Sequence, residues 1–204
     1  MSIGPLEMEV KFFLKSPEAV HQRLKSMGAR AKPKLFEINT CYDDSLHRIA
    51  HSDGVLRLRQ DDACRLTLKR RPIRVDPDVK AYEELEVLVS DVDTMEKILG
   101  GLGYHPARRY EKWRQTYILE KTLVCIDTLP FGTFLEIEGD KTAIRQTAQR
   151  LGMKWEKRIL TNYLAIFDRL RKKAQLDFGN PTFDHFNGLD LSVEPFLAPF
   201  EAGQ

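Results

Sequence analysis

The chain has 204 residues, of which 42% are hydrophobic and 30% charged, and its formal net charge is +2. This length suits one domain with an appendage. The near-neutral charge argues against a nucleic-acid or membrane-surface partner, and no apolar run approaches the roughly 18 residues of a membrane span. The N-terminus does not resemble a signal peptide. The three cysteines, Cys41, Cys64 and Cys125, lack CxxC spacing, so we expect a reducing compartment and a cytoplasmic protein, as a monomer or homodimer.

The first half of the chain predicts one helix among several strands. A strand is expected at 6–14, followed by the helix PEAVHQRLKSMG, which has Ser16 at its N-cap and Pro17 at its first position. Gly28 ends this helix. Three extended runs follow, near 35–43, 54–60 and 64–70.

The second half repeats this order. A strand is expected at 82–89, with Ser90 and Asp91 as cap candidates for the helix DVDTMEKILGGLG. Its glycines mark a helix end and not a nucleotide-binding loop. Extended runs follow near 108–118, 122–128 and 133–139.

Two such β-α-β-β-β units give about eight strands, and their period of about 75 residues is too long for a solenoid. We therefore expect an α+β protein: a closed eight-stranded antiparallel β-barrel with helices packed on its outside. Two further helices fit 141–151 and roughly 158–174. We place the domain at 1–174. The tail at 175–204 lacks periodicity, and its composition fits a linker, a flexible arm or a strap over the domain.

Charged residues recur at every second position of the predicted strands. In EMEVKF, Glu7, Glu9 and Lys11 share one strand face, and apolar residues share the other. The other charged members are Arg57 and Arg59, Arg65 and Lys69, Glu84 and Glu86, Lys112 and Arg114, Asp127, and Glu136 and Glu138.

Antiparallel sheets usually turn such a polar face to solvent. Two features favour a different arrangement: the set is almost entirely Arg, Lys, Glu and Asp, and the amphipathic helices need an apolar sheet surface to cover. We therefore expect the charges to line the bore of the barrel. Because unpaired buried charges are costly, the pattern indicates a site where bases bind phosphates and carboxylates hold Mg²⁺ or Mn²⁺.

In these residues the sequence resembles the CYTH superfamily, also called triphosphate tunnel metalloenzymes. The resemblance runs in order from residue 6 to about residue 170. It rests on the E-x-E-x-K pattern that starts at Glu7, on R-x-R, LTLKR, a second E-x-E, K-x-R and CIDTLPFGTFLEIEG. It implies a tunnel of eight antiparallel strands that binds a triphosphate and hydrolyses or cyclises it with a divalent metal.

The resemblance also implies roles for individual residues. The implied metal ligands are Glu7, Glu9, Asp127, Glu136 and Glu138. The implied substrate-binding residues are Lys11, Arg57, Arg59, Lys69, Lys112 and Arg114, with Glu84 and Glu86 in the same site. Lys69 and Lys11 are the candidate catalytic residues, with Lys69 as the base because a lysine pKa falls near other cations.

The substrate stays open at this point. The layout is most similar to bacterial proteins of the class IV adenylate cyclase branch, which also contains inorganic triphosphatases and thiamine-triphosphatase-like enzymes. ATP, thiamine triphosphate and tripolyphosphate are therefore all candidates. The alternative is a module that binds polyphosphate or nucleotide without turnover. A third hypothesis is a structural protein with a solvated charged face.

Four further residues allow two interpretations each. Tyr163 either closes over the site or packs in the core. Cys125 shares the strand face of Asp127, but a small buried residue is a simpler explanation than a nucleophile. His47 and His51 are four residues apart in a segment that we interpret as a loop and not as a metal site.

Overall fold

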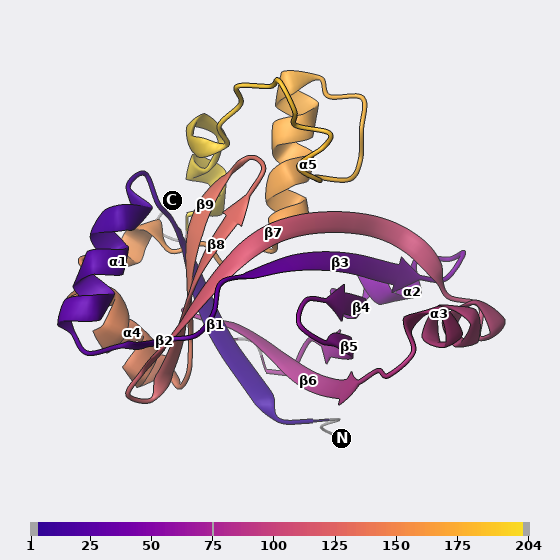
Figure 1. Ribbon diagram of the computed structural model, residues 1–204, viewed down its shortest axis with the longest axis horizontal. Helices are drawn as coiled ribbons and strands as arrows, with labels where there is room; N and C mark the ends of the chain where they lie inside the picture. Colours follow the sequence, from indigo (N-terminus) through magenta and orange to yellow (C-terminus); the bar gives the residue numbers. More distant parts are fainter. Residues whose placement is uncertain (1–3, 75, 202–204) are drawn as a thin grey trace.

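The computed structural model describes residues 4–74 and 76–201. Within them, nine strands form one antiparallel sheet in the order β2-β7-β3-β4-β5-β6-β1-β9-β8, and pairing of β7 with β8 closes it. The result is an eight-stranded barrel with β2 added on the outer edge of β7 (Figure 1). The predicted α+β barrel is confirmed.

The first half contributes β1 (Leu6–Phe13), β2 (Arg30–Ala31), β3 (Leu35–Asp43), β4 (Val55–Gln60) and β5 (Cys64–Arg70). The second half contributes β6 (Lys80–Leu88), β7 (His105–Leu119), β8 (Thr122–Leu129) and β9 (Gly132–Glu138). The helices are α1 (Pro17–Ser26), α2 (Arg48–His51), α3 (Val92–Gly101), α4 (Lys141–Arg150) and α5 (Tyr163–Ala174). Short 3₁₀ turns are η1 (Trp155–Lys157), η2 (Glu194–Phe196) and η3 (Ala198–Phe200). No helix in the described ranges is both long and apolar enough to cross a membrane.

The helix ends follow the local sequence signals. Asp91 caps α3 by accepting a hydrogen bond from the backbone N–H of Thr94 at 3.0 Å. Ser16 precedes Pro17 as expected but makes no side-chain cap bond. Gly28 and Gly103 follow α1 and α3 with φ of 74° and 87°, the left-handed conformation that glycine adopts without strain.

The last helix starts later than predicted. The sequence predicts a helix over 158–174, but α5 begins at Tyr163 with Asn162 as its N-cap. Ile159 is extended because it bridges to β1: its N–H donates to the Lys11 carbonyl at 2.8 Å, and the Lys11 N–H donates back at 3.1 Å. This bridge places the start of α5 beside the barrel.

Figure 1 shows the helices on the outside of the barrel, and apolar side chains of most strands pack against them, whereas Leu85 and Val87 on β6 stay exposed. Val10 and Ile137 of the barrel are fully buried with Leu24 of α1 and Ile144 of α4. A second cluster packs α3 on β4, and a third packs α5 on the loop between β8 and β9. The burial of these faces outside the barrel leaves its interior to the charged residues.

The described tail residues lie over α5 and the open edge of β7. Phe186, Val193 and Leu197 are buried in the same cluster as α5. The backbone N–H of Glu111 on β7 donates to the Pro181 carbonyl at 3.1 Å. These residues therefore form a strap, packed by apolar side chains and bonded to the barrel.

Candidate functional site

A cavity of about 1120 Å³ occupies the barrel interior, larger than most small-molecule sites. All but one of the predicted site residues line it. These are Glu7, Glu9, Lys11, Arg57, Arg59, Lys69, Glu84, Glu86, Lys112, Arg114, Glu136 and Glu138. The alternation of charged and apolar residues therefore builds a charged bore inside an apolar outer shell.

Three carboxylates gather on β1 and β9. Glu9, Glu136 and Glu138 each offer an oxygen atom, and the three oxygens lie within 4.8 Å of one another. The strand register produces this group, because Glu9 is opposite Glu138 and Lys11 is opposite Glu136. The Lys11 Nζ lies 3.0 Å from Glu136 Oε1. An all-carboxylate donor set fits a hard divalent cation such as Mg²⁺ or Mn²⁺.

The charge states in this group follow from its lysines. Burial alone would raise the pKa of Glu9, but Lys11 and Lys80 outweigh it and lower that pKa to about 2. Lys11 and Arg114 likewise outweigh burial at Glu136 and hold its pKa well below its usual range. Burial raises the pKa of Glu138. The group thus holds at least two ionised carboxylates at neutral pH.

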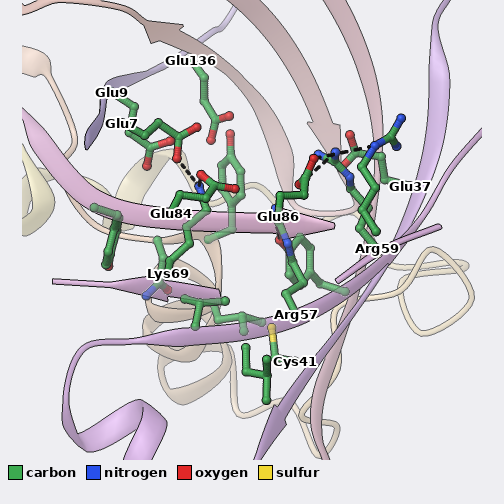
Figure 2. A pocket seen from close by; sticks show the side chains of 18 of the residues that line it. Glu7, Glu9, Glu37, Cys41, Arg57, Arg59, Lys69, Glu84, Glu86 and Glu136 are labelled. Atoms are coloured by element: carbon green, nitrogen blue, oxygen red, sulfur yellow. Dashed lines mark hydrogen bonds and ion pairs between the residues drawn. The ribbon is translucent and has the colours of Figure 1, made fainter. Parts of the chain in front are cut away.

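Glu7 lies outside this group of three and beside Lys69. Lys69 Nζ bonds to Glu7 and lies 2.8 Å from Glu84 Oε2, and Figure 2 shows Glu7 and Glu9 close together above Lys69. Burial raises the pKa of Glu7 to about 8, aided by a hydrogen bond with Glu84.

The surroundings of Lys69 correct one premise of its predicted role. Burial would lower the pKa of Lys69, but the carboxylates of Glu7 and Glu9 outweigh burial and raise it above its usual range. The expectation that neighbouring cations lower this pKa is therefore wrong, because the groups in contact with its ammonium are acids. The role of Lys69 as a base stays a prediction without that support.

Asp127 is the predicted site residue that does not line the cavity. It is fully buried and accepts hydrogen bonds from Lys112 Nζ at 2.7 Å, from Arg114 Nε at 2.7 Å and Nη2 at 2.6 Å, and from the Tyr163 hydroxyl at 3.1 Å. Three of these bonds reach Oδ2 and one reaches Oδ1, so this carboxylate already binds both neighbouring cations. The geometry thus favours a positioning role for Asp127 behind Lys112 and Arg114.

Arg57 forms no ion pair with any carboxylate in residues 4–74 or 76–201. The partner of its Nη1 is the Tyr110 hydroxyl at 3.2 Å. The Nε atom of Arg57 is also buried without a hydrogen-bond partner in the described chain. Arg59 does contact carboxylates, Asp61 at 3.2 Å and Glu86 at 3.6 Å. A half-buried guanidinium without an ion-pair partner fits an anionic ligand.

Several cavity residues were missed from sequence. Lys80 on β6 is opposite Glu9, and its Nζ lies 3.2 Å from Glu9 Oε1. Burial, together with Lys11, lowers the pKa of Lys80 to about 8. Glu37 on β3 is opposite Lys112 in the strand register, and its Oε2 lies 3.5 Å from Lys112 Nζ. The two-residue period could have found both, because Lys80 is in phase with Glu84 and Glu37 follows the apolar start of its own strand.

The structure decides between the two interpretations given above for Tyr163, Cys125 and the two histidines. Tyr163 does both: its ring packs with Phe134, and its hydroxyl bonds to Asp127. Cys125 lines the cavity, but burial raises the pKa of its thiol to about 12, so it is protonated at neutral pH. His47 is the N-cap of the one-turn helix α2 and His51 is its last residue, so this segment is helical and not the predicted loop; the two ring centres lie 6.3 Å apart. Neither belongs to a metal-ligand group in the described residues.

Comparisons with known proteins agree with this architecture. Residues 5–159 match the model of the CYTH domain. A protein of Methanocaldococcus jannaschii named "putative adenylate cyclase" is 28% identical over 134 residues, 65% of this chain and 76% of its own length.

Two solved structures share the fold. One is described as a "putative adenylate cyclase" from Vibrio parahaemolyticus, with a TM-score of 0.70 at 19% identity, covering 81% of this chain and 99% of that one. The other is a "putative adenylyl cyclase" from Hippeastrum that "reveals a dominant" triphosphatase activity, with a TM-score of 0.57 at 20% identity, covering 79% and 95%. From the domain match over most of its length, this chain belongs to the CYTH domain family.

Proposed function

We propose that the protein is a metal-dependent phosphoryl-transfer enzyme that acts on a triphosphate inside the barrel, as a triphosphatase or as an adenylate cyclase. One observation carries the proposal: the group of Glu9, Glu136 and Glu138 shares a cavity with Arg57, a half-buried cation without a carboxylate partner in the described residues. A site for a cation and a polyanion at once is what phosphoryl transfer needs.

The residues divide into two sets. Glu9, Glu136 and Glu138 would hold Mg²⁺ or Mn²⁺, with Glu7 nearby. The cations that would bind the triphosphate are Lys11, Arg57, Arg59, Lys69, Lys80, Lys112 and Arg114, all on the cavity wall. When bound, the metal would neutralise charge on the phosphate oxygens. The relatives described as cyclases and as a triphosphatase support both reaction types equally.

The test is a substrate panel of tripolyphosphate, ATP and thiamine triphosphate with Mg²⁺ or Mn²⁺, with products identified by phosphorus NMR. We expect turnover of at least one substrate, and loss of turnover in Glu9→Gln and Glu138→Gln. Glu18→Gln, an exposed position on α1, is the matched control and should keep full activity. Ligand binding without any product in the wild-type protein would contradict an enzymatic function.

A further inference from the structure

The lysines of the cavity differ in how they are paired. Lys11, Lys69 and Lys112 each form ion pairs with two carboxylates. Lys80 forms an ion pair with one carboxylate in the described residues, that of Glu9, with 3.2 Å between the Lys80 Nζ and Glu9 Oε1. Of these four lysines, Lys80 is therefore held by the fewest carboxylates.

Lys80 also shares its partner with another lysine. The Lys11 Nζ lies 2.5 Å from the same oxygen, Glu9 Oε1, and keeps a second contact to Glu136 at 3.0 Å. The longer contact to Glu9 thus belongs to the lysine without a second partner. Because a lysine side chain has a flexible stem of four carbons, the Lys80 ammonium can move while β6 stays in place. Glu9 then remains paired with Lys11.

The strand register places Lys80 beside the metal group. β1 lies between β6 and β9, so Glu9 is opposite Lys80 on one side and opposite Glu138 on the other. The three side chains form a row across three strands, and all three line the cavity. A divalent cation bound to Glu9 would repel an ammonium on the same carboxylate, and burial strengthens this repulsion because little water or salt screens it.

The same group needs positive charge when no metal is bound. One oxygen from each of Glu9, Glu136 and Glu138 lies within 4.8 Å of the others, so the ionised groups repel one another. Lys80 reduces this repulsion because it brings a positive charge to Glu9. The Tyr82 ring supports the ammonium in this position, with its centre 4.9 Å from Lys80 Nζ.

We propose that Lys80 is a displaceable counter-ion of the metal group: it stabilises Glu9 in the metal-free protein and moves away when a divalent cation binds. This inference rests on the metal site of the proposed function. Lys80 is then a positioning residue that opposes metal binding, and its charge sets the metal concentration at which the site fills.

Calorimetric titration of the metal-free protein with Mn²⁺, in the absence of substrate, tests this role. We expect Lys80→Met to lower the Mn²⁺ dissociation constant about tenfold, because no ammonium has to be displaced. Lys80→Arg keeps the charge and should stay within about threefold of the wild type. Lys32→Met removes a charge from an exposed lysine that also lines the cavity. It is the matched control and should likewise stay within about threefold.

Melting temperatures provide a second measurement, which does not depend on turnover. Metal-free Lys80→Met should melt below the wild type, because the carboxylates have lost a counter-charge. Saturating Mn²⁺ should raise the melting temperature of Lys80→Met more than that of the wild type, since a ligand that binds the native state more tightly stabilises it more.

The sign of the change in Mn²⁺ affinity decides the outcome. If the wild type binds Mn²⁺ and Lys80→Met binds it equally or more weakly, Lys80 is not a competing counter-ion. An equal gain in Lys32→Met would also overturn the inference, because it would show a general effect of cavity charge. Absence of Mn²⁺ binding in both the wild type and Lys80→Met would overturn the metal site of the proposed function, and this inference with it. Lys80→Gln, which is also uncharged, replaces Lys80→Met if that variant does not fold, and the same gain is expected.

Discussion

The Tyr163 hydroxyl donates a hydrogen bond to Asp127 Oδ2 at 3.1 Å, and this bond joins the first residue of α5 to the wall of the charged cavity. Tyr163 also places its ring 5.3 Å from Lys11 Nζ and 5.4 Å from Lys112 Nζ. Two of the cavity lysines are thus held between an aromatic face and their carboxylates.

Asp127→Asn tests whether this carboxylate positions cations or binds metal. The substitution removes the carboxylate closest to the buried Lys112, which Arg114 also contacts, and leaves the longer contacts of both to Glu37, so we expect a loss of stability of roughly 3 kcal/mol. The Mn²⁺ dissociation constant, measured by calorimetry, should stay within about threefold, whereas Glu138→Gln should raise it at least about tenfold. An equal loss of Mn²⁺ affinity in both variants would show that Asp127 is a metal ligand.

Arg57→Ala should weaken binding in proportion to ligand length. Because Arg57 has no carboxylate partner in the described residues, its charge is available to a bound anion. We expect the affinity for tripolyphosphate to fall about tenfold to hundredfold, and affinities for diphosphate and monophosphate to fall less. Calorimetric titration of the three anions provides the measurement. Arg30→Ala on the outer strand β2 is the control, and equal losses for all three anions in Arg57→Ala would argue against a clamp along the bore.

Much of this site was predictable because a β-strand has a period of two residues. Once Glu7, Glu9 and Lys11 are assigned to one face, the phase of every other strand follows from its own charges. The decision that the charged faces point inward depended on the amphipathic helices, which need the apolar faces. Burial of Ile144 and Leu24 against the outer surface of the barrel agrees with that choice.

Other features depend on contacts between distant segments. Nothing in the local sequence at Ile159 indicates that it pairs with Lys11, and this pairing delays the start of α5. The strap likewise has no periodicity, and it is bonded to β7 through the Glu111 backbone and through the side chains of Asn180 and Glu111. The position of Asp127 outside the metal group was also not predictable. The two-residue period shows that Asp127 faces inward, but it does not show which residues of the neighbouring strand bind it.

Removal of residues 176–204 should impair folding, because the described part of this tail is a packed strap and not a flexible arm. Phe186 is 6% exposed in the aromatic cluster with Phe131 and Phe167. We expect Phe186→Ala alone to cost roughly 3 kcal/mol of unfolding free energy, and the truncated chain to aggregate because the edge of β7 is exposed. Leu189→Ala, at a position 44% exposed, should cost little. Thermal melting and size-exclusion chromatography report both effects, and a truncated protein with a wild-type melt would show that the strap is dispensable.

Lys69→Arg and Lys69→Met together test how Lys69 acts. Since the carboxylates of Glu84 and Glu9 hold its ammonium as a cation, we expect Lys69→Arg to keep turnover within about tenfold with an unchanged pH profile, because it keeps the charge. Lys69→Met, which removes the charge, should lower turnover at least about hundredfold. Rates measured from pH 6 to 10 distinguish the cases. An inactive Lys69→Arg with a flattened alkaline limb would support the predicted role as a base instead.

The last prediction concerns the stability of the metal-free protein as a function of pH. The pKa of Glu7 is raised from 4.5 to about 8, chiefly by burial. A raised carboxyl pKa means that the folded protein keeps a proton that the unfolded chain releases. The contribution of Glu7 to stability is therefore complete below about pH 4.5 and is lost as the pH rises towards 8. Glu7→Gln stays neutral at every pH and avoids this loss, although it should lower turnover.

We therefore compare melting temperatures with a chelator present. The melting temperature of Glu7→Gln minus that of the wild type should increase between pH 5 and 8 and stay constant above that range. We expect the melting temperature to gain at least about 2 °C, which is less than the full pKa shift of Glu7 would produce in a chain of this size. Glu18→Gln, on the exposed face of α1, should follow the wild type throughout. Parallel curves for wild type and Glu7→Gln would mean that Glu7 is already ionised in the folded protein, with Lys69 as a sufficient counter-charge.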